Sequence, residues 1–209
     1  MFIPVILYFV IFCYVPMYGV IISFQDYYPR LGITGSEWVG FKHFEKLFTG
    51  RYFFPVLRNT LIISIGKLLF GFPAPIILCL LLNEVRSLKF KKVVQTISYL
   101  PHFISWVVLA SIVQTILSPS SGVVNYIIQL LGGEPIFFMG SSDWFRKVIV
   151  GSSIWRDTGW QTVVFMAAIL SIDPQLYEAA DLDGAGRFQK MIYVTLPCIA
   201  PTIIIMFIM

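Results

Sequence analysis

Charged residues are scarce in this sequence. Of its 209 residues only 12% are Asp, Glu, Lys or Arg, whereas 57% are hydrophobic and the mean hydropathy is +0.82. A soluble domain carries roughly twice that charged fraction. This chain has too little polar surface to stay in water, so the composition predicts an integral membrane protein.

Cysteine is also rare, and its placement excludes the usual metal and redox motifs. Cys13, Cys79 and Cys198 lie inside apolar runs, and none forms a C-x-x-C pair or has a histidine at ligand spacing. We expect them to be apolar packing residues. The net charge of +4 is scattered among apolar stretches and forms no basic patch with interleaved aromatics, which argues against nucleic acid as a partner.

The motifs of nucleotide hydrolysis and proteolysis are missing as well. Around the single Gly-Lys pair, Gly66-Lys67, Leu61 stands where an ATP-binding loop needs glycine, and Leu68 stands where it needs Ser or Thr. Neither Gly-x-Ser-x-Gly nor His-Glu-x-x-His occurs. We therefore expect no catalytic residue, metal or cofactor in this chain, and any ATP-driven activity would need a second polypeptide.

Apolar segments recur with the length of membrane-crossing helices. A bilayer core of about 30 Å needs roughly 20 helical residues, and spans are predicted at about residues 2–24, 60–82, 95–117, 148–172 and 197–209. The last would cover only about 20 Å at 1.5 Å per residue, so we expect the chain to be cut within a helix of a longer protein. The predicted fold is all-α, a polytopic membrane helix bundle forming one transmembrane domain over residues 1–209.

A polar stretch, residues 173–197, separates the last two spans. Asp173 is suited to cap a helix and Pro174 to occupy its first position, followed by good helix formers up to Leu182. Gly184 is suited to end this helix because glycine adopts positive φ at no steric cost. Leu196-Pro197 is predicted to end a second short helix and to open the last apolar run. The stretch is therefore predicted to form two short helices at a membrane surface.

The spacing of Glu178-Ala179-Ala180, Gly184 and Leu196-Pro197 resembles the EAA loop of bacterial ABC importer permeases. In that family the loop docks into a groove of a separate cytoplasmic ATPase and passes its movement to the membrane helices. Glu178 would make polar contacts with the ATPase, Gly184 would permit close approach, and Phe188 and Met191 would fill the groove. The ATPase-coupling set that the resemblance implies is Glu178, Ala179, Ala180, Asp183, Gly184, Phe188, Met191, Leu196 and Pro197.

Four further stretches resemble the maltose-type permeases linked to polysaccharide utilisation: Ala74-Pro75-Ile76-Ile77, Leu81-Leu82-Asn83-Glu84-Val85, Ser98-Tyr99-Leu100-Pro101-His102 and Gly133-Glu134-Pro135-Ile136. The resemblance implies a type I importer permease that moves oligosaccharides across the bacterial cytoplasmic membrane. Its partners would be an ABC ATPase dimer that binds ATP and Mg, a second permease subunit and an extracellular sugar-binding lipoprotein. A secondary transporter or channel that needs no ATPase stays open as the alternative.

In this family the EAA loop faces the cytoplasm, and that orientation places several charges in the outer half of the membrane. Lys67 would lie roughly 10 Å deep, and Arg156 and Asp157 about 12 Å deep. Intramembrane charge is costly and usually faces the bundle interior. We therefore hypothesise a ring along the substrate pathway that contains Lys67, Trp155, Arg156, Asp157 and Trp160.

An alternative explains the same charges without a pathway. Lys67 and Arg156 would reach up to the outer interface, and Asp157 would pair with Arg156 or cap a helix. His102, beside Pro101, is expected near the cytoplasmic side, where it would form a hydrogen bond at the proline bend.

Overall fold

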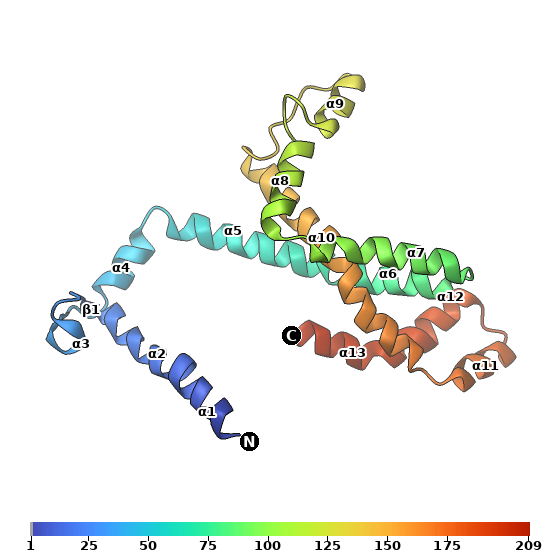
Figure 1. Ribbon diagram of the computed structural model, residues 1–209, viewed down its shortest axis with the longest axis horizontal. Coiled ribbons are helices and arrows are strands. Elements are labelled where there is room, and N and C mark those ends of the chain that lie inside the picture. Colours follow the sequence, from blue (N-terminus) through green and yellow to red (C-terminus); the bar gives the residue numbers. More distant parts are fainter. Residues whose placement is uncertain (1) are drawn as a thin grey trace. The chain divides into compact units, whose positions relative to one another are not determined.

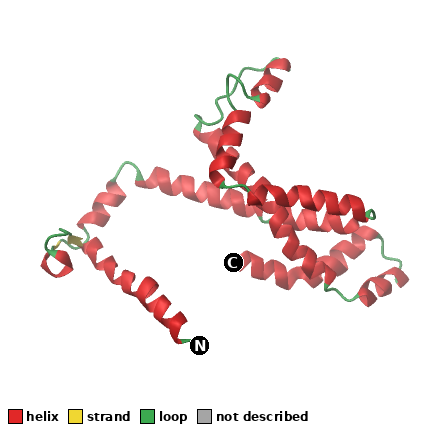
Figure 2. Ribbon diagram, viewed as in Figure 1, coloured by secondary structure: helices red, strands yellow, loops and turns green. Residues whose placement is uncertain are grey.

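The computed structural model describes residues 2–209, and nearly all of its regular structure is helical (Figure 1; Figure 2). Within the described residues one antiparallel sheet occurs, a pairing of β1 (Gln25–Asp26) with β2 (Glu37–Trp38). The all-α prediction is confirmed. The contacts divide the chain into two units, the first ending at Thr60 and the second beginning at Leu61.

The first unit begins with an apolar helix of 22 residues, Ile3–Phe24. It consists of α1 (Ile3–Phe9), the π-helix η1 (Val10–Tyr14), α2 (Val15–Met17) and the 3₁₀-helix η2 (Tyr18–Phe24). The two strands, α3 (Gly32–Gly35) and α4 (Lys42–Thr49) follow. Lys42 donates a 2.6 Å hydrogen bond to Asp26, and this ammonium holds the pKa of the Asp26 carboxyl below its usual range.

The second unit is built from longer helices. The division falls inside α5 (Phe53–Gly66), which continues through the π-helix η3 (Lys67–Gly71) into α6 (Pro73–Glu84). Then come α7 (Leu88–Tyr99), the 3₁₀-helix η4 (Leu100–Phe103), α8 (Trp106–Ile116), α9 (Val123–Leu130) and α10 (Ser142–Leu170). The unit ends with α11 (Pro174–Leu182), α12 (Arg187–Lys190), the π-helix η5 (Met191–Thr195) and α13 (Leu196–Ile208).

The described helices agree with several membrane crossings but differ from the predicted boundaries. Ile3–Phe24, Phe53–Glu84 and Arg187–Ile208 are long and apolar enough to cross a membrane. Two bent pairs, Leu88–Phe103 with Trp106–Ile116 and Ser142–Leu170 with Pro174–Leu182, raise the number to five if each is one span. The third predicted span is not straight, because its two helices meet at 105°. The first helix agrees with its predicted span, whereas the other helices begin before the predicted limits, because hydropathy marks only the apolar part of a helix.

Proline residues inside the apolar helices are accompanied by wider turns. The π-helices Val10–Tyr14, Lys67–Gly71 and Met191–Thr195 each end two residues before a proline, namely Pro16, Pro73 and Pro197. A proline ring collides with the carbonyl four residues earlier, and a π turn changes the position of that carbonyl. The last helix therefore runs through Leu196-Pro197. The prediction that this pair ends the second short helix was wrong, although the last apolar run does begin there.

The core of the second unit lies where α10 packs against α6, α7 and α13. Its buried side chains are Cys79, Leu82, Phe165, Met166, Ile169 and Ile199. Gly159 permits the close contact of α10 with α7, since a Cβ there would lie 1.9 Å from the Ser98 carbonyl oxygen. Of the three cysteines, Cys79 packs in this core as expected, whereas Cys13 and Cys198 are exposed.

Candidate functional site

The polar loop before the last helix forms a defined helical hairpin. The Asp173 carboxylate accepts the Gln175 N–H at 2.9 Å and caps α11. At the other end, Gly184 N–H donates to the Asp181 carbonyl at 3.1 Å and Ala185 N–H donates to the Ala180 carbonyl at 2.9 Å. This is a Schellman cap, and Gly184 has the positive φ of 77° that it requires. The predicted cap and glycine turn are confirmed.

Two side-chain contacts fasten α11 to the start of the last apolar helix. Lys190 Nζ lies 2.6 Å from Asp181 Oδ1. The hydroxyls of Tyr177 and Thr195 lie 2.9 Å apart, and Thr195 is buried. The Gly186 N–H donates to the Gln189 side chain at 2.7 Å and so caps α12. A displacement of α11 would therefore move the helix that begins at Arg187.

The tip of this hairpin exposes large apolar side chains. Leu182 is 90% exposed and Phe188 is 68% exposed, whereas Met191 is partly covered. Leu182 was not among the predicted coupling residues, although an apolar residue directly before Asp183-Gly184 was the available signal. The other predicted members divide by exposure: Glu178, Ala179, Asp183 and Gly184 are exposed on the hairpin, Ala180 is partly covered, and Leu196 and Pro197 lie inside the following helix.

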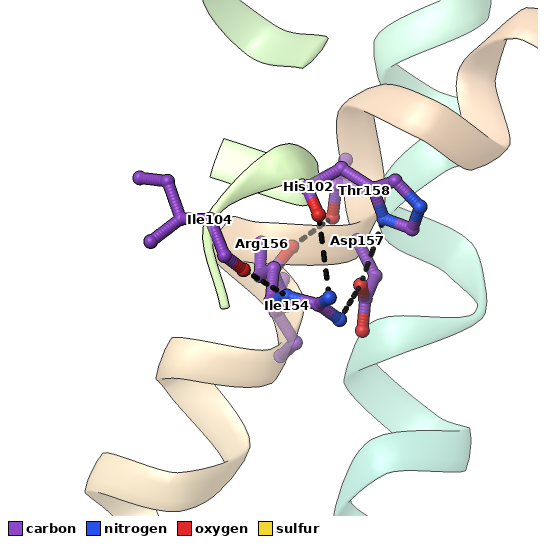
Figure 3. Close-up of polar contacts among 6 residues, drawn as sticks. All are labelled: His102, Ile104, Ile154, Arg156, Asp157 and Thr158. Carbon is purple, nitrogen blue, oxygen red and sulfur yellow. Dashed lines mark hydrogen bonds and ion pairs between the residues drawn. The ribbon is translucent and has the colours of Figure 1, made fainter. Parts of the chain in front are cut away.

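A second polar cluster lies where α10 passes the break between η4 and α8 (Figure 3). Arg156 donates to the carbonyls of His102 at 3.2 Å and Ile104 at 3.4 Å, and to Asp157 Oδ1 at 3.0 Å. Carbonyls at the end of a helix have no partner within the helix. The guanidinium of Arg156 supplies those partners, and its central carbon lies 4.6 Å from the centroid of the Trp106 ring.

His102, which follows Pro101 at this break, also belongs to the cluster. Its Nδ1 lies 3.3 Å from Asp157 Oδ1, and its ring stacks on Trp160 with centroids 5.0 Å apart and planes at 4°. The predicted hydrogen bond of His102 beside the Pro101 bend is present, but its partner is Asp157, which was expected at a different depth of the membrane. Depth was counted along a straight span, whereas the bend after Phe103 brings His102 beside α10.

The predicted ring of five residues is therefore divided. Arg156, Asp157 and Trp160 lie together around His102, and the Arg156–Asp157 ion pair that the alternative expected is present. Lys67 lines a pocket of about 480 Å³ together with Asp157. Trp155 borders a different pocket, beside Ala74, Ser98 and Pro101.

Two neighbouring pockets meet at Lys67. The first has a polar lining that includes Ser64, Ser153, Asp157, Thr158 and Gln161. The second, of about 450 Å³, is lined by Trp106, Gln114, Phe145 and other residues of α8 and α10. In the described part of the chain, residues 2–209, no three His, Cys, Asp or Glu residues are grouped to hold a metal ion.

Comparison with known proteins identifies the family. Residues 71–209 match the family described as "Binding-protein-dependent transport system inner membrane component". The chain belongs to this family. Together with its apolar helices, this makes it part of a multi-pass inner membrane component of a binding-protein-dependent transport system, which agrees with the resemblance.

Individual relatives agree with the polysaccharide branch. The Polygalacturonan/rhamnogalacturonan transport system permease protein YteP of Bacillus subtilis (strain 168) is 50% identical over 100% of this chain and 65% of its own length. Protein LplB of the same organism is 51% identical over 99% of this chain and 65% of its own length. This chain therefore spans just under two thirds of the length of these two curated relatives.

A solved structure has the same fold. The crystal structure of a bacterial ABC transporter involved in the import of the acidic polysaccharide alginate contains a chain that is 46% identical, with a TM-score of 0.87. The match covers 97% of this chain and 68% of that one. A second structure shows the bacterial alginate ABC transporter in complex with an alginate pentasaccharide-bound periplasmic protein; its matching chain is 46% identical, with a TM-score of 0.86 over 96% of this chain and 66% of that one.

Proposed function

We propose that the whole protein is the permease subunit of an ATP-driven ABC importer that moves oligosaccharides across the cytoplasmic membrane by alternating access. The observation that carries this proposal is the hairpin of α11 and α12. It exposes Leu182 and Phe188 at the tip of a polar loop, where most of their side-chain surface is left uncovered by this chain. Exposed apolar side chains rimmed by polar residues mark a protein interaction site.

The partner of this surface is a separate ATPase dimer that binds ATP and Mg. Leu182, Phe188 and Met191 enter its groove, Glu178 contacts its polar rim, and Gly184 lets the turn approach closely. When the ATPases close on ATP, α11 moves. The Lys190–Asp181 and Tyr177–Thr195 contacts then pass this movement to the helix that begins at Arg187.

An oligosaccharide is the proposed cargo, and a second permease and an external binding protein complete the importer. Relatives named for polygalacturonan, arabinooligosaccharides and galactooligosaccharides support a sugar, and the alginate transporter solved with its periplasmic protein supports a binding protein. A sugar ring needs aromatic faces for its C–H groups and polar partners for its hydroxyls. The two pockets beside Lys67 offer both, through Trp106 and the polar residues around Asp157.

The test is uptake of a labelled oligosaccharide into proteoliposomes that contain the complete protein, its partner permease, the ATPases and the binding protein. We expect uptake only with ATP at the ATPase side. Leu182→Asp should reduce uptake at least about tenfold, because burying one unpaired carboxylate in a groove costs more than 1.4 kcal/mol. Leu182→Met, which stays apolar, should retain uptake.

Two results would contradict this proposal. ATP-independent uptake by the wild-type assembly would indicate a secondary transporter. Full activity of Leu182→Asp would show that the hairpin tip does not dock into a groove.

A further inference from the structure

Lys67 lies deep inside an apolar helix. It follows Asn59 by eight residues and precedes Asn83 by 16 in the continuous helix Phe53–Glu84, which corresponds to about 12 and 24 Å along the axis. A charge at such a depth is costly, and membrane proteins keep one where it has a partner or lines a water-filled path. Within residues 2–209 no carboxylate forms an ion pair with the Lys67 ammonium.

The neighbouring carboxylate is already occupied. Asp157 lines the same pocket as Lys67, but its Oδ1 lies 3.0 Å from Arg156 Nη1 and 3.3 Å from His102 Nδ1. Lys67 and Arg156 supply two positive charges against the single negative charge of Asp157. Together with His102, these residues carry at least one uncompensated positive charge, whether or not His102 is protonated. Lys67 is the cationic residue that lines the pocket.

From this arrangement we infer that Lys67 forms a subsite for the carboxylate of a uronic acid residue in the transported oligosaccharide. The inference rests on the proposed function, because it needs a sugar to pass this chain. A carboxylate carries one negative charge and so balances the positive charge of Lys67. Ser64, Ser153 and Gln161 in the same pocket offer hydrogen bonds to hydroxyls, and Trp106 in the adjoining pocket offers an aromatic face to a ring.

The contacts of Asp157 agree with a carboxylate subsite at Lys67. A carboxylate without cationic partners in the pocket that Lys67 lines would repel an anionic sugar. Arg156 and His102 shield Asp157, so that it positions the helix break without opposing the cargo. Arg156 is a positioning residue here, and Lys67 is the residue that selects the charge of the sugar.

The experiment compares two sugars with the same rings and linkages, one with free carboxylates and one with neutral methyl esters in their place. Equilibrium binding of trigalacturonate and of its fully methyl-esterified form is measured on the complete importer in nanodiscs, without the binding protein, so that the permease alone decides the preference. We expect the wild-type complex to bind the acid about tenfold more tightly, since a hydrogen bond to a charged group contributes this order of affinity. The preference should weaken with added salt.

Variants assign the preference to one residue. Lys67→Met should abolish the difference between acid and ester, while Lys67→Arg should retain it. Lys89→Met, the same change on an exposed residue of α7 outside both pockets, should leave it unaltered. Size-exclusion chromatography of each complex verifies that the variants still assemble.

Equal affinity for both sugars, or no measurable binding of the acid, by the wild-type complex would overturn the subsite. So would an acid preference that survives Lys67→Met. These failures differ from failure of the proposed function. An importer that takes up neutral oligosaccharides with ATP would keep its function and lose only the subsite, whereas uptake without ATP would refute the importer itself.

Discussion

Arg156 should stabilise the bend between η4 and α8, and the substitution Arg156→Leu tests this directly. The substitution removes hydrogen bonds to the His102 carbonyl, the Ile104 carbonyl and Asp157. Hydrogen bonds between membrane helices average about 0.6 kcal/mol each, so three contribute about 2 kcal/mol. The loss of the arginine partner of Asp157 adds to this cost, although the Asp157 side chain is 28% exposed and keeps His102 as a partner. We expect a loss of about 2–3 kcal/mol in the free energy of unfolding.

Reversible unfolding of the complete protein in mixed micelles measures this loss. Arg86→Leu is the matched control, because Arg86 is exposed in the turn between α6 and α7, and it should change stability by less than about 0.5 kcal/mol. Arg156→Lys should lie between these values, since lysine keeps the charge but loses the planar fork. The double variant Arg156→Leu, Asp157→Leu should recover part of the loss, because no carboxylate is then left unpaired.

A loss below about 0.5 kcal/mol for Arg156→Leu, within the range of ordinary surface changes, would refute this reasoning. The same holds if the double variant is less stable than the single one. Either result would mean that the carbonyls at the break find other partners, and that the cluster does not hold α10 to α8.

Three further changes test the packing of the second unit. Gly159→Ala should lower the free energy of unfolding by about 3 kcal/mol, because the new Cβ would lie 1.9 Å from the Ser98 carbonyl oxygen. A variant as stable as the wild type would contradict the close approach of α7 and α10. Thr162→Val should cost about 0.6 kcal/mol in the same assay, because it removes the hydroxyl that donates to the Thr158 carbonyl at 2.7 Å and to the Pro75 carbonyl at 3.3 Å. Asn125→Ala should speed proteolysis between α8 and α10 about tenfold, since the loss of one buried polar anchor costs at least 1.4 kcal/mol; Asn125 is 1% exposed and bonds three carbonyls and one N–H. An unaltered cleavage rate would show that the loop is held by other contacts.

The hairpin could be predicted from sequence because its signals are local. Asp173 caps α11 within two residues, and Gly184 satisfies a turn that involves only Ala180 to Ala185. Residue types at fixed short spacing determine such structure. The membrane character also follows from composition alone, since no arrangement of the chain could cover its apolar surface.

The intramembrane cluster could not be predicted in the same way. His102 and Asp157 are 55 residues apart, and their contact depends on a 105° bend whose angle no local pattern encodes. The helix end predicted at Leu196-Pro197 failed for a related reason. Proline usually marks the end of a helix, but here it follows a π turn that accommodates its ring. Trp155 was grouped with its neighbours by sequence, whereas helical rotation points it to another pocket.

The most direct test of the central claim is purification of the complete protein from its native membranes in mild detergent, with Gly184→Trp and Gly184→Asn beside the wild type. A Cβ at Gly184 would meet no atom of this chain within 4 Å, so a large side chain has room in the permease itself. Asparagine tolerates the positive φ with a small side chain, and so controls for backbone strain. We predict that an ABC ATPase co-purifies with the wild type and with Gly184→Asn and is lost from Gly184→Trp. An ATPase retained by Gly184→Trp, or absent from the wild type while other membrane complexes stay intact, would contradict the coupling role of this hairpin.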